Sequence, residues 1–364
     1  MINRLITFKN SSPFLYILSY GIITALLFSY FIYAEHFDIT IKFINTFFGI
    51  ASLALLLYAP KKAILVAGFC IGLLWFYWIG YSFEYQGVGY MLPIITLGFG
   101  IIYTLFFGVL ALTNKVYIRA ILLFALSFFE PFDWNWLQIE LIFIESYIGI
   151  FKYQLAIVLV ALCLVHYTKK SIRFLPLVLL VFAINFQTPQ QATSSLKIKL
   201  IQTDIKQDEK WLLANRMSTI NMVLQKTQQA KLDNYDIIIF PESVFPMYLN
   251  KNTELIEVLL DLSHDIAIIT GSLLKENKQN YNVTYMFYEG KYTVAKKMVL
   301  VPFGEYIPLP SFARQIINNT FFSGQSDFIQ AKSPQTLQLK VRHFVMLFAM
   351  RQAAKNSMKG MLNS

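Results

Sequence analysis

Residues 237–243 read Ile-Ile-Ile-Phe-Pro-Glu-Ser, a short apolar run that ends in a Pro-Glu pair. A continuous apolar run of this length is typical of a strand buried between two layers of a domain. Because α/β folds place their sites at the carboxyl ends of strands, Glu242 lies where a catalytic carboxylate is expected. Partial burial there would raise its pKa and suit it to act as a general base. A Glu that caps a helix or faces solvent is the structural alternative.

The segments on both sides of this strand alternate between strand and amphipathic-helix patterns. The predicted strands are 196–205, 236–240 and 265–273, the predicted helices are 208–231 and 253–262, and a hairpin over 285–300 turns at Glu289-Gly290. Such alternation predicts an α/β sandwich domain.

Residues 297–309 read Lys-Met-Val-Leu-Val-Pro-Phe-Gly-Glu-Tyr-Ile-Pro-Leu. Lys297 and Glu305 therefore bracket a strand-like run and a Pro-Phe-Gly turn. A Lys held near a carboxylate can stabilise an oxyanion without being a nucleophile. The structural alternative is a solvated lysine at a strand end, as its neighbour Lys296 illustrates.

The first half of the chain has the composition of a membrane domain. The 364 residues are 56% hydrophobic and 14% charged, with a mean hydropathy of +0.51, which excludes disordered, collagen-like and disulfide-stapled proteins. Apolar runs able to cross a bilayer, which takes about 20 residues, recur up to residue 190. We predict a membrane domain at residues 1–190 with about seven transmembrane helices, at 13–34, 41–58, 62–83, 90–113, 116–133, 153–168 and 172–187.

Positive charge predicts the orientation of these spans. With the N-terminus in the cytoplasm, only Lys42 and Lys152 lie on the outer side, as the positive-inside rule favours. The basic residues on the inner side are Arg4, Lys9, Lys61, Lys62, Lys115, Arg119, Lys169, Lys170 and Arg173. An odd number of spans then delivers the second half of the chain to the extracytoplasmic side.

Several other classes of site are not indicated. Cys70 and Cys163 lie inside apolar runs with no partner at metal-ligand spacing, so neither a disulfide framework nor a zinc site is predicted. The net charge of +10 is not concentrated on a basic face interleaved with aromatic residues, so no nucleic acid is expected as a partner. We expect no cofactor and no metal.

Taken together, the Pro-Glu segment, the 297–309 run and the multispan region resemble apolipoprotein N-acyltransferase, a membrane family of the nitrilase (carbon–nitrogen hydrolase) superfamily. Weaker similarities are Gln202 in the first predicted strand, the aromatic segment 75–82 and Tyr281-Asn282. The resemblance implies a multispan α-helical membrane domain followed by an α/β nitrilase-like sandwich domain.

The resemblance also implies a Glu–Lys–Cys triad. Glu242 would be the base, Lys297 the oxyanion stabiliser and Glu305 a supporting carboxylate. A cysteine thiolate would take an acyl chain from a phospholipid as a thioester and pass it to the α-amine of the diacylglyceryl-cysteine of a lipoprotein. The implied location is the bacterial inner membrane, with the N-terminus cytoplasmic and the catalytic domain periplasmic.

This sequence departs from the family at the nucleophile. The family carries its cysteine in a Cys-Tyr-Glu segment, which this chain lacks, and Cys70 and Cys163 lie in predicted spans. Residues 345–364 are rich in Met and contain no Asp or Glu. Back-translation of 344–351, read from the third base of the Phe344 codon, permits Arg-Asn-Ala-Ile-Cys-Tyr-Glu.

We therefore expect one base to have been lost near that codon. On this hypothesis residues 195–344 form a nitrilase-like domain that is incomplete at its C-terminus, and 345–364 are an out-of-frame tail. The chain as written would lack the closing strands and span of the family, and it would be poorly stable and inactive.

Two alternatives stay open. One is a membrane-tethered nitrilase-like amidase, or a related acyltransferase with another acceptor, which would share Glu242 and Lys297. The other is a non-catalytic membrane protein. An exposed apolar arm near the site would favour the lipid enzyme, and the sequence offers 286–288 and 321–324 as candidates.

Overall fold

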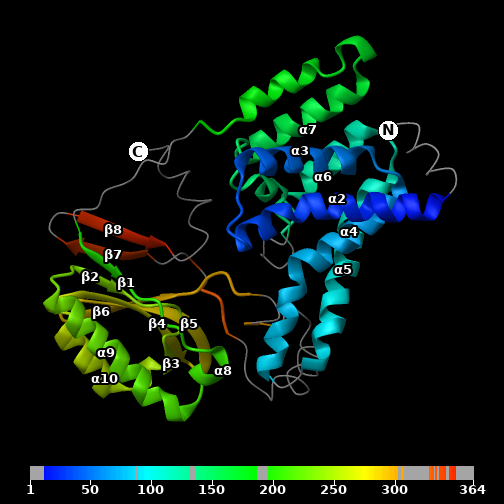
Figure 1. Ribbon diagram of the computed structural model, residues 1–364. Helices are drawn as coiled ribbons and strands as arrows, with labels where there is room; N and C mark the ends of the chain where they lie inside the picture. The colour runs from blue at the N-terminus through cyan, green and yellow to red at the C-terminus, as the bar shows by residue number, and fades with distance from the viewer. Residues whose placement is uncertain are drawn as a thin grey trace. The chain divides into compact units, whose positions relative to one another are not determined.

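The computed structural model describes residues 12–86, 89–130, 137–186, 196–301, 305–306, 328–331, 333, 336–341 and 344–349 (Figure 1). The chain divides into two compact units, one before and one after the segment 187–195. The first unit is helical and the second is built on a mixed β-sheet. We describe each by itself.

The helical unit follows the predicted spans closely. Its α-helices are α2 (Pro13–His36), α3 (Lys42–Tyr58), α4 (Lys61–Phe76), α5 (Leu92–Gly108), α6 (Val116–Leu126) and α7 (Lys152–Tyr167), and its 3₁₀ helices include η1 (Tyr77–Gln86), η3 (Val109–Leu112), η5 (Ile139–Phe143) and η7 (Leu175–Ala183).

Within the part of the chain that the structure describes, three helical segments are long and apolar enough to cross a membrane. They are Pro13–His36, Lys61–Tyr81 and Gly89–Leu112. Helices α3, α6 and α7 are apolar but shorter. The last predicted span is the 3₁₀ helix η7, whose Pro176 stands near its start. Every predicted span therefore contains helix, while the number that crosses a bilayer stays a prediction.

Helices α4 and α5 pack closely because glycines line one side of α4. A Cβ atom at Gly68 would lie 2.7 Å from the carbonyl oxygen of Tyr103, and one at Gly72 would lie 2.8 Å from the Cβ of Tyr103 and clash with the Phe99 carbonyl. Small residues four apart permit such close backbone contact between helices in a membrane.

Arg119 of α6 joins three helical segments from inside this unit. Arg119 is 3% exposed, and its guanidinium donates hydrogen bonds to the carbonyls of Leu57, Ala59, Leu110 and Thr113. These carbonyls lie at the ends of α3 and η3, where a helix has no partners of its own for them. Arg119 therefore satisfies them and fixes α6 against both ends.

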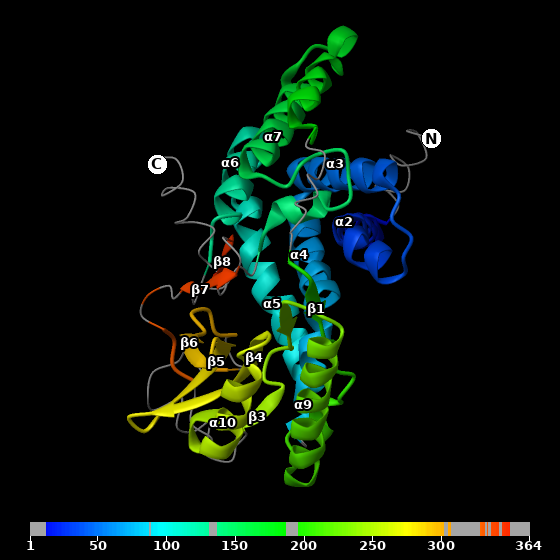
Figure 2. The same ribbon diagram turned by 90° about the vertical axis from the view of Figure 1, so that its left-hand side faces the viewer.

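The second unit is a sheet with helices on one face. The strands are β1 (Ile198–Leu200), β2 (Ile237–Ile239), β3 (Phe245–Tyr248), β4 (Ala267–Glu276), β5 (Gln279–Tyr288) and β6 (Lys291–Lys296), in the order β1-β2-β4-β5-β6, with β3 also paired to β4. Strands β1, β2 and β3 are parallel to their neighbours, and β5 and β6 are antiparallel to theirs. Figure 2 shows β4, β5 and β6 side by side. Helices α9 (Arg216–Leu232) and α10 (Thr253–Leu262) contribute to the main core of this unit.

The side chains of neighbouring sheet residues point to opposite faces. Ile238, Ile268 and Tyr285 belong to the core beneath α9 and α10, whereas Ile269 and Met286 belong to a smaller cluster. Because side chains alternate along a strand, this smaller cluster marks the second face of the sheet.

The elements predicted around the Pro-Glu segment are confirmed, with four differences. The strand expected at 196–205 is confined to β1, at Ile198–Leu200. The helix expected from residue 208 begins at Arg216, because the chain first forms the short helices α8 (Gln207–Lys210) and η8 (Leu213–Asn215). Strand β3 was not predicted. The β4–β5 hairpin was not predicted either. At its turn, Asn277 and Lys278 both have positive φ. The turn at Glu289-Gly290 is confirmed.

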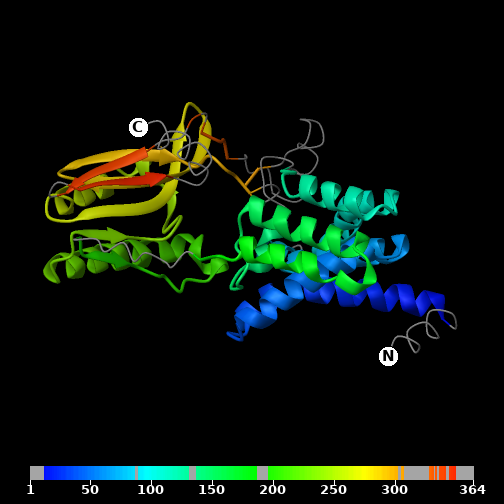
Figure 3. The same ribbon diagram turned by 90° about the horizontal axis from the view of Figure 1, so that it is seen from above.

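A second, two-stranded sheet pairs β7 (Thr336–Val341) with β8 (Phe344–Ala349) (Figure 3). Strand β8 crosses the boundary predicted at residue 344. Backbone pairing does not depend on a particular set of side chains, so the out-of-frame tail stays a prediction.

The α4–α5 contact leads to a first prediction. Gly72→Ala places a methyl group against α5 and is expected to lower the stability of the helical unit by roughly 1–3 kcal/mol through overpacking. Gly98→Ala is the matched control, because a Cβ atom at Gly98 meets nothing within 4 Å. Thermal unfolding in detergent micelles compares the two variants. Equal melting temperatures would contradict the close contact.

Candidate active site

Glu242 is carried on a tight turn at the end of β2. Ser243, the next residue, has a φ of 51°, which lies in the left-handed region. The turn rests on Gly271 of β4, where a Cβ atom would lie 2.7 Å from the Glu242 Cα and clash with the Ser243 nitrogen. Only glycine leaves room for this approach, so β4 fixes where the turn can lie.

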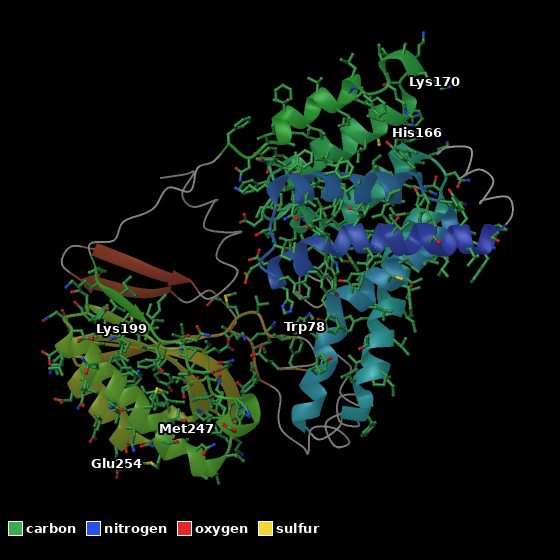
Figure 4. The ribbon with its side chains drawn as sticks, viewed as in Figure 1. Trp78, His166, Lys170, Lys199, Met247 and Glu254 are labelled. Carbon is green, nitrogen blue, oxygen red and sulfur yellow. The ribbon has the colours of Figure 1, made fainter. Side chains whose placement is uncertain are left out.

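Asn282 and Lys297 reach the turn from the antiparallel part of the sheet. The backbone N–H of Lys297 donates to the Asn282 carbonyl at 2.9 Å, directly after β6 ends. Side chains alternate along a strand, so Asn282 lies on the same face as Met286, four residues later. Lys297 lies two residues after Ala295 and therefore lies on that face as well. The site therefore lies on the face of the sheet opposite α9 and α10. Figure 4 draws the described side chains, with Lys199 and Glu254 labelled in this unit.

Two donors hold two carboxylates together. Lys297 Nζ lies 2.9 Å from Glu242 Oε1 and 2.9 Å from Glu305 Oε1. Asn282 Nδ2 donates to the same two oxygens, at 2.6 Å and 2.9 Å. The structure thus brings together all three residues predicted from the sequence and adds Asn282. The signal for Asn282 in the sequence was its place in the Tyr281-Asn282 pair, which resembles the family.

The two carboxylates differ in their surroundings. Glu305 Oε2 accepts a hydrogen bond from the Val301 N–H at 2.8 Å, and the Glu305 N–H donates back to the Val301 carbonyl. The Glu305 side chain is 15% exposed, whereas that of Glu242 is 58% exposed. Glu305 is therefore fixed by its own turn, and Glu242 is the carboxylate that a substrate can reach.

The electrostatics of Glu242 differ from the expectation. Burial by itself raises the pKa of Glu242, but the hydrogen bond and charge of Lys297, the hydrogen bond from Asn282 and the charge of Lys210 outweigh it, and the pKa is lowered from 4.5. The expected upward shift is therefore wrong, because the partners act more strongly than burial.

Lys297 is shifted in the complementary direction. Burial lowers the pKa of Lys297, but its hydrogen bonds and charge interactions with Glu242 and Glu305 outweigh burial and raise the pKa above 10.5. Near neutral pH the site therefore holds an ammonium between two carboxylates. Such an arrangement can accept a proton at Glu242 and stabilise an oxyanion at Lys297.

The two thiols of the chain belong to the helical unit. Cys70 lies in α4 and Cys163 in α7, and both are partly buried. Among the described residues, no group of three or more His, Cys, Asp and Glu side chains could hold a metal ion. The sheet unit therefore brings Glu242, Lys297 and Glu305 together without a thiol of its own.

An exposed apolar segment adjoins the site. Lys210 donates a hydrogen bond to the Glu242 carbonyl, and the residues that follow it are exposed, namely Trp211, Leu212, Leu213 and Met217. The prediction that 286–288 forms an exposed apolar arm is wrong, because Met286 and Phe287 are buried within the sheet. The second candidate, 321–324, lies outside the described residues.

Together, the apolar helices and this sheet define a membrane protein with a Glu–Lys site in a mixed-sheet domain. The apolipoprotein N-acyltransferase integral membrane domain matches residues 15–186. Apolipoprotein N-acyltransferase from Wolinella succinogenes is 36% identical over 317 residues, covering 86% of this chain and 77% of that protein.

Two further relatives carry the same name. The protein from Helicobacter hepaticus is 34% identical over 78% of this chain and 72% of its own length. The protein from Campylobacter jejuni is 36% identical over 84% of this chain and 69% of its own length. The chain belongs to the apolipoprotein N-acyltransferase family.

The shared ammonium leads to a second prediction. The pKa of Glu242 is lowered on folding, so its contribution to stability is complete above 4.5 and is lost as the pH falls through the folded value. The pKa of Lys297 is raised, so its contribution is complete below 10.5 and is lost at higher pH. Lys297→Met is expected to remove the Lys297 contribution and the part of the Glu242 contribution that Lys297 supplies, which together amount to roughly 1–2 kcal/mol after screening by solvent.

Thermal unfolding between about pH 4 and pH 11 measures this effect. The variant should melt at a lower temperature than the parent between the two pKa values, and the difference should shrink as the pH falls below 4.5 or rises above 10.5. Lys296→Met is the control, because Lys296 pairs with Glu276 at the surface. Identical pH profiles for Lys297→Met and the parent would show that the ammonium does not hold the carboxylates.

Proposed function

We propose that this chain carries the acyl-transfer site of an apolipoprotein N-acyltransferase, which moves an acyl chain from a phospholipid to the α-amine of a lipoprotein's diacylglyceryl-cysteine. The proposal is carried by the position of Lys297 Nζ, which lies 2.9 Å from both Glu242 and Glu305. The group lies directly after a strand, in a chain that belongs to this membrane-protein family. The exposed segment from Trp211 to Met217 supports a substrate with long apolar chains.

In this proposal Glu242 takes the proton of a cysteine thiol, and the thiolate attacks the ester carbonyl of the phospholipid. Lys297 stabilises the oxyanion that forms. The C–O bond breaks, the lysophospholipid alkoxide leaves with the proton from Glu242, and a thioester remains. The α-amine of the lipoprotein then attacks the thioester, Glu242 takes the amine proton, and this proton returns to the sulfur as the amide forms.

The proposal requires a nucleophile that this sequence lacks. We place it in the alternative reading frame after the Phe344 codon, where Cys-Tyr-Glu can be encoded. The codons from Gln330 to Ser364 should therefore show one additional base when the gene is sequenced again. An intact frame in independent reads would contradict this part of the proposal and would favour a non-catalytic membrane protein.

The same proposal gives the protein its place in the cell. The helical unit lies in the bacterial inner membrane with its N-terminus in the cytoplasm, and the sheet unit lies in the periplasm. The distribution of Lys and Arg along the chain supports this orientation.

Acyl transfer is the direct test, and it gives a third prediction. Membranes that contain the protein are incubated with a phospholipid whose acyl chain carries an alkyne and with a diacylglyceryl-cysteine peptide. The chain as given is expected to form neither a hydroxylamine-sensitive thioester nor the N-acyl peptide, and a gene with the base restored should form both. In that background Glu242→Gln should slow transfer by about 10²–10⁴-fold, the usual contribution of a general base.

The matched control is Glu276→Gln, which changes an exposed glutamate of the same sheet and should leave the rate unchanged. Transfer by the chain as given would show that the missing thiol is not required. A folded protein with the base restored that transfers nothing would contradict the N-acyltransferase proposal itself.

A further inference from the structure

Lys210 reaches the site from α8, an element that carries neither of the two carboxylates nor the donors Asn282 and Lys297. It is the last residue of α8, the short helix that interrupts the chain before α9. Its Nζ donates a hydrogen bond of 3.1 Å to the backbone carbonyl of Glu242. It therefore holds the backbone of the proposed base, while Lys297 holds the carboxylate.

The backbone at this point needs such support. Ser243 adopts a left-handed φ of 51°, which is strained for a residue that has a side chain. Within the turn, the Val244 N–H donates to the Pro241 carbonyl at a long distance of 3.4 Å. Gly271 limits the turn from one side by close contact. The Glu242–Ser243 peptide is thus confined by β4 and anchored at its oxygen by Lys210.

We propose that Lys210 is a positioning residue that anchors the Glu242–Ser243 peptide and so directs the Glu242 carboxylate toward Lys297. The inference rests on the proposed function in one respect, which is that Glu242 is the base. Lys210 does not contact the reacting atoms in this proposal, and it acts through the geometry and charge of Glu242.

The charges around Glu242 agree with this role. The groups that face it are Lys297 after β6, Lys210 on α8, the Asn282 amide on β5, and Glu305, which shares Lys297 and Asn282 with it. Burial lowers the pKa of Lys210, and the negative charge of Glu242 opposes that shift. In turn the positive charge of Lys210 adds to that of Lys297 in lowering the pKa of Glu242.

The test follows the titration of Glu242 in the full-length protein in detergent micelles. Glutamate labelled with ¹³C at Cδ gives one carboxyl signal per residue, and the signal absent from Glu242→Gln is that of Glu242. Lys210→Met should shift the midpoint of this titration upward and should speed exchange of the Val244 amide hydrogen by about tenfold, as expected when a charged hydrogen bond is lost. Lys210→Arg should restore both values toward those of the parent.

Lys206→Met is the matched control, because Lys206 is an exposed lysine four residues earlier in the same segment. It should leave the titration and the exchange rate unchanged. Lys210→Gln keeps a donor but removes the charge, so it should shift the titration with less effect on exchange. This variant also supplies the reading if Lys210→Met does not fold.

A folded Lys210→Met or Lys210→Gln protein whose Glu242 titrates as in the parent would overturn the proposal. So would an equal shift in Lys206→Met, which would assign the effect to net charge. Neither the Glu242 titration nor the Val244 exchange rate depends on acyl transfer. A negative result in the transfer assay would therefore refute the proposed function without deciding whether Lys210 positions Glu242.

Discussion

One ammonium shared by two carboxylates is the interaction that the site depends on. Glu242 and Glu305 accept hydrogen bonds from the same two donors, so their like charges repel each other, and burial by itself raises the pKa of Glu242. Lys297 and Asn282 remove that conflict by donating to the same oxygen of each carboxylate. For this to happen, the end of β2, the middle of β5 and the end of β6 must meet on one face. The register of the mixed sheet meets that requirement, so the sheet pairing and the ionised site stabilise each other.

The parallel part of the sheet supplies Glu242, and the antiparallel part supplies its partners. Between them runs β4, which pairs with β2 on one side and β5 on the other. Gly271 on β4 lets the Glu242 turn approach closely enough for the Lys297 ammonium to reach its carboxylate. A larger residue would move the turn away from the sheet, and the carboxylate would then keep its charge only by facing water. The pKa of Glu242 is therefore set by the packing of β4 as well as by its charged neighbours.

The sequence predicted Glu242, Lys297 and Glu305 because strand-end carboxylates and the long run after Lys297 are local patterns. It did not predict Asn282 in a bonding role or Lys210, since their contacts arise from strand register and from a helix break at residues 211–215. The direction of the Glu242 pKa shift was wrong for a related reason. A sequence indicates that a residue is partly buried, but the balance between burial and several donors exists only once the sheet has formed.

A partly buried network of this kind is poor evidence of selection for stability. An ion pair removed from water loses hydration that its mutual attraction only partly returns, and apolar residues of similar volume often stabilise a protein as well or better. Four elements nevertheless converge to keep Glu242 ionised, directed and partly open to solvent. Proteins tolerate such costs mainly where a reaction requires them. The arrangement of Lys297, Asn282 and Glu305 around one accessible carboxylate therefore supports the proposal that this sheet carries a site for proton transfer.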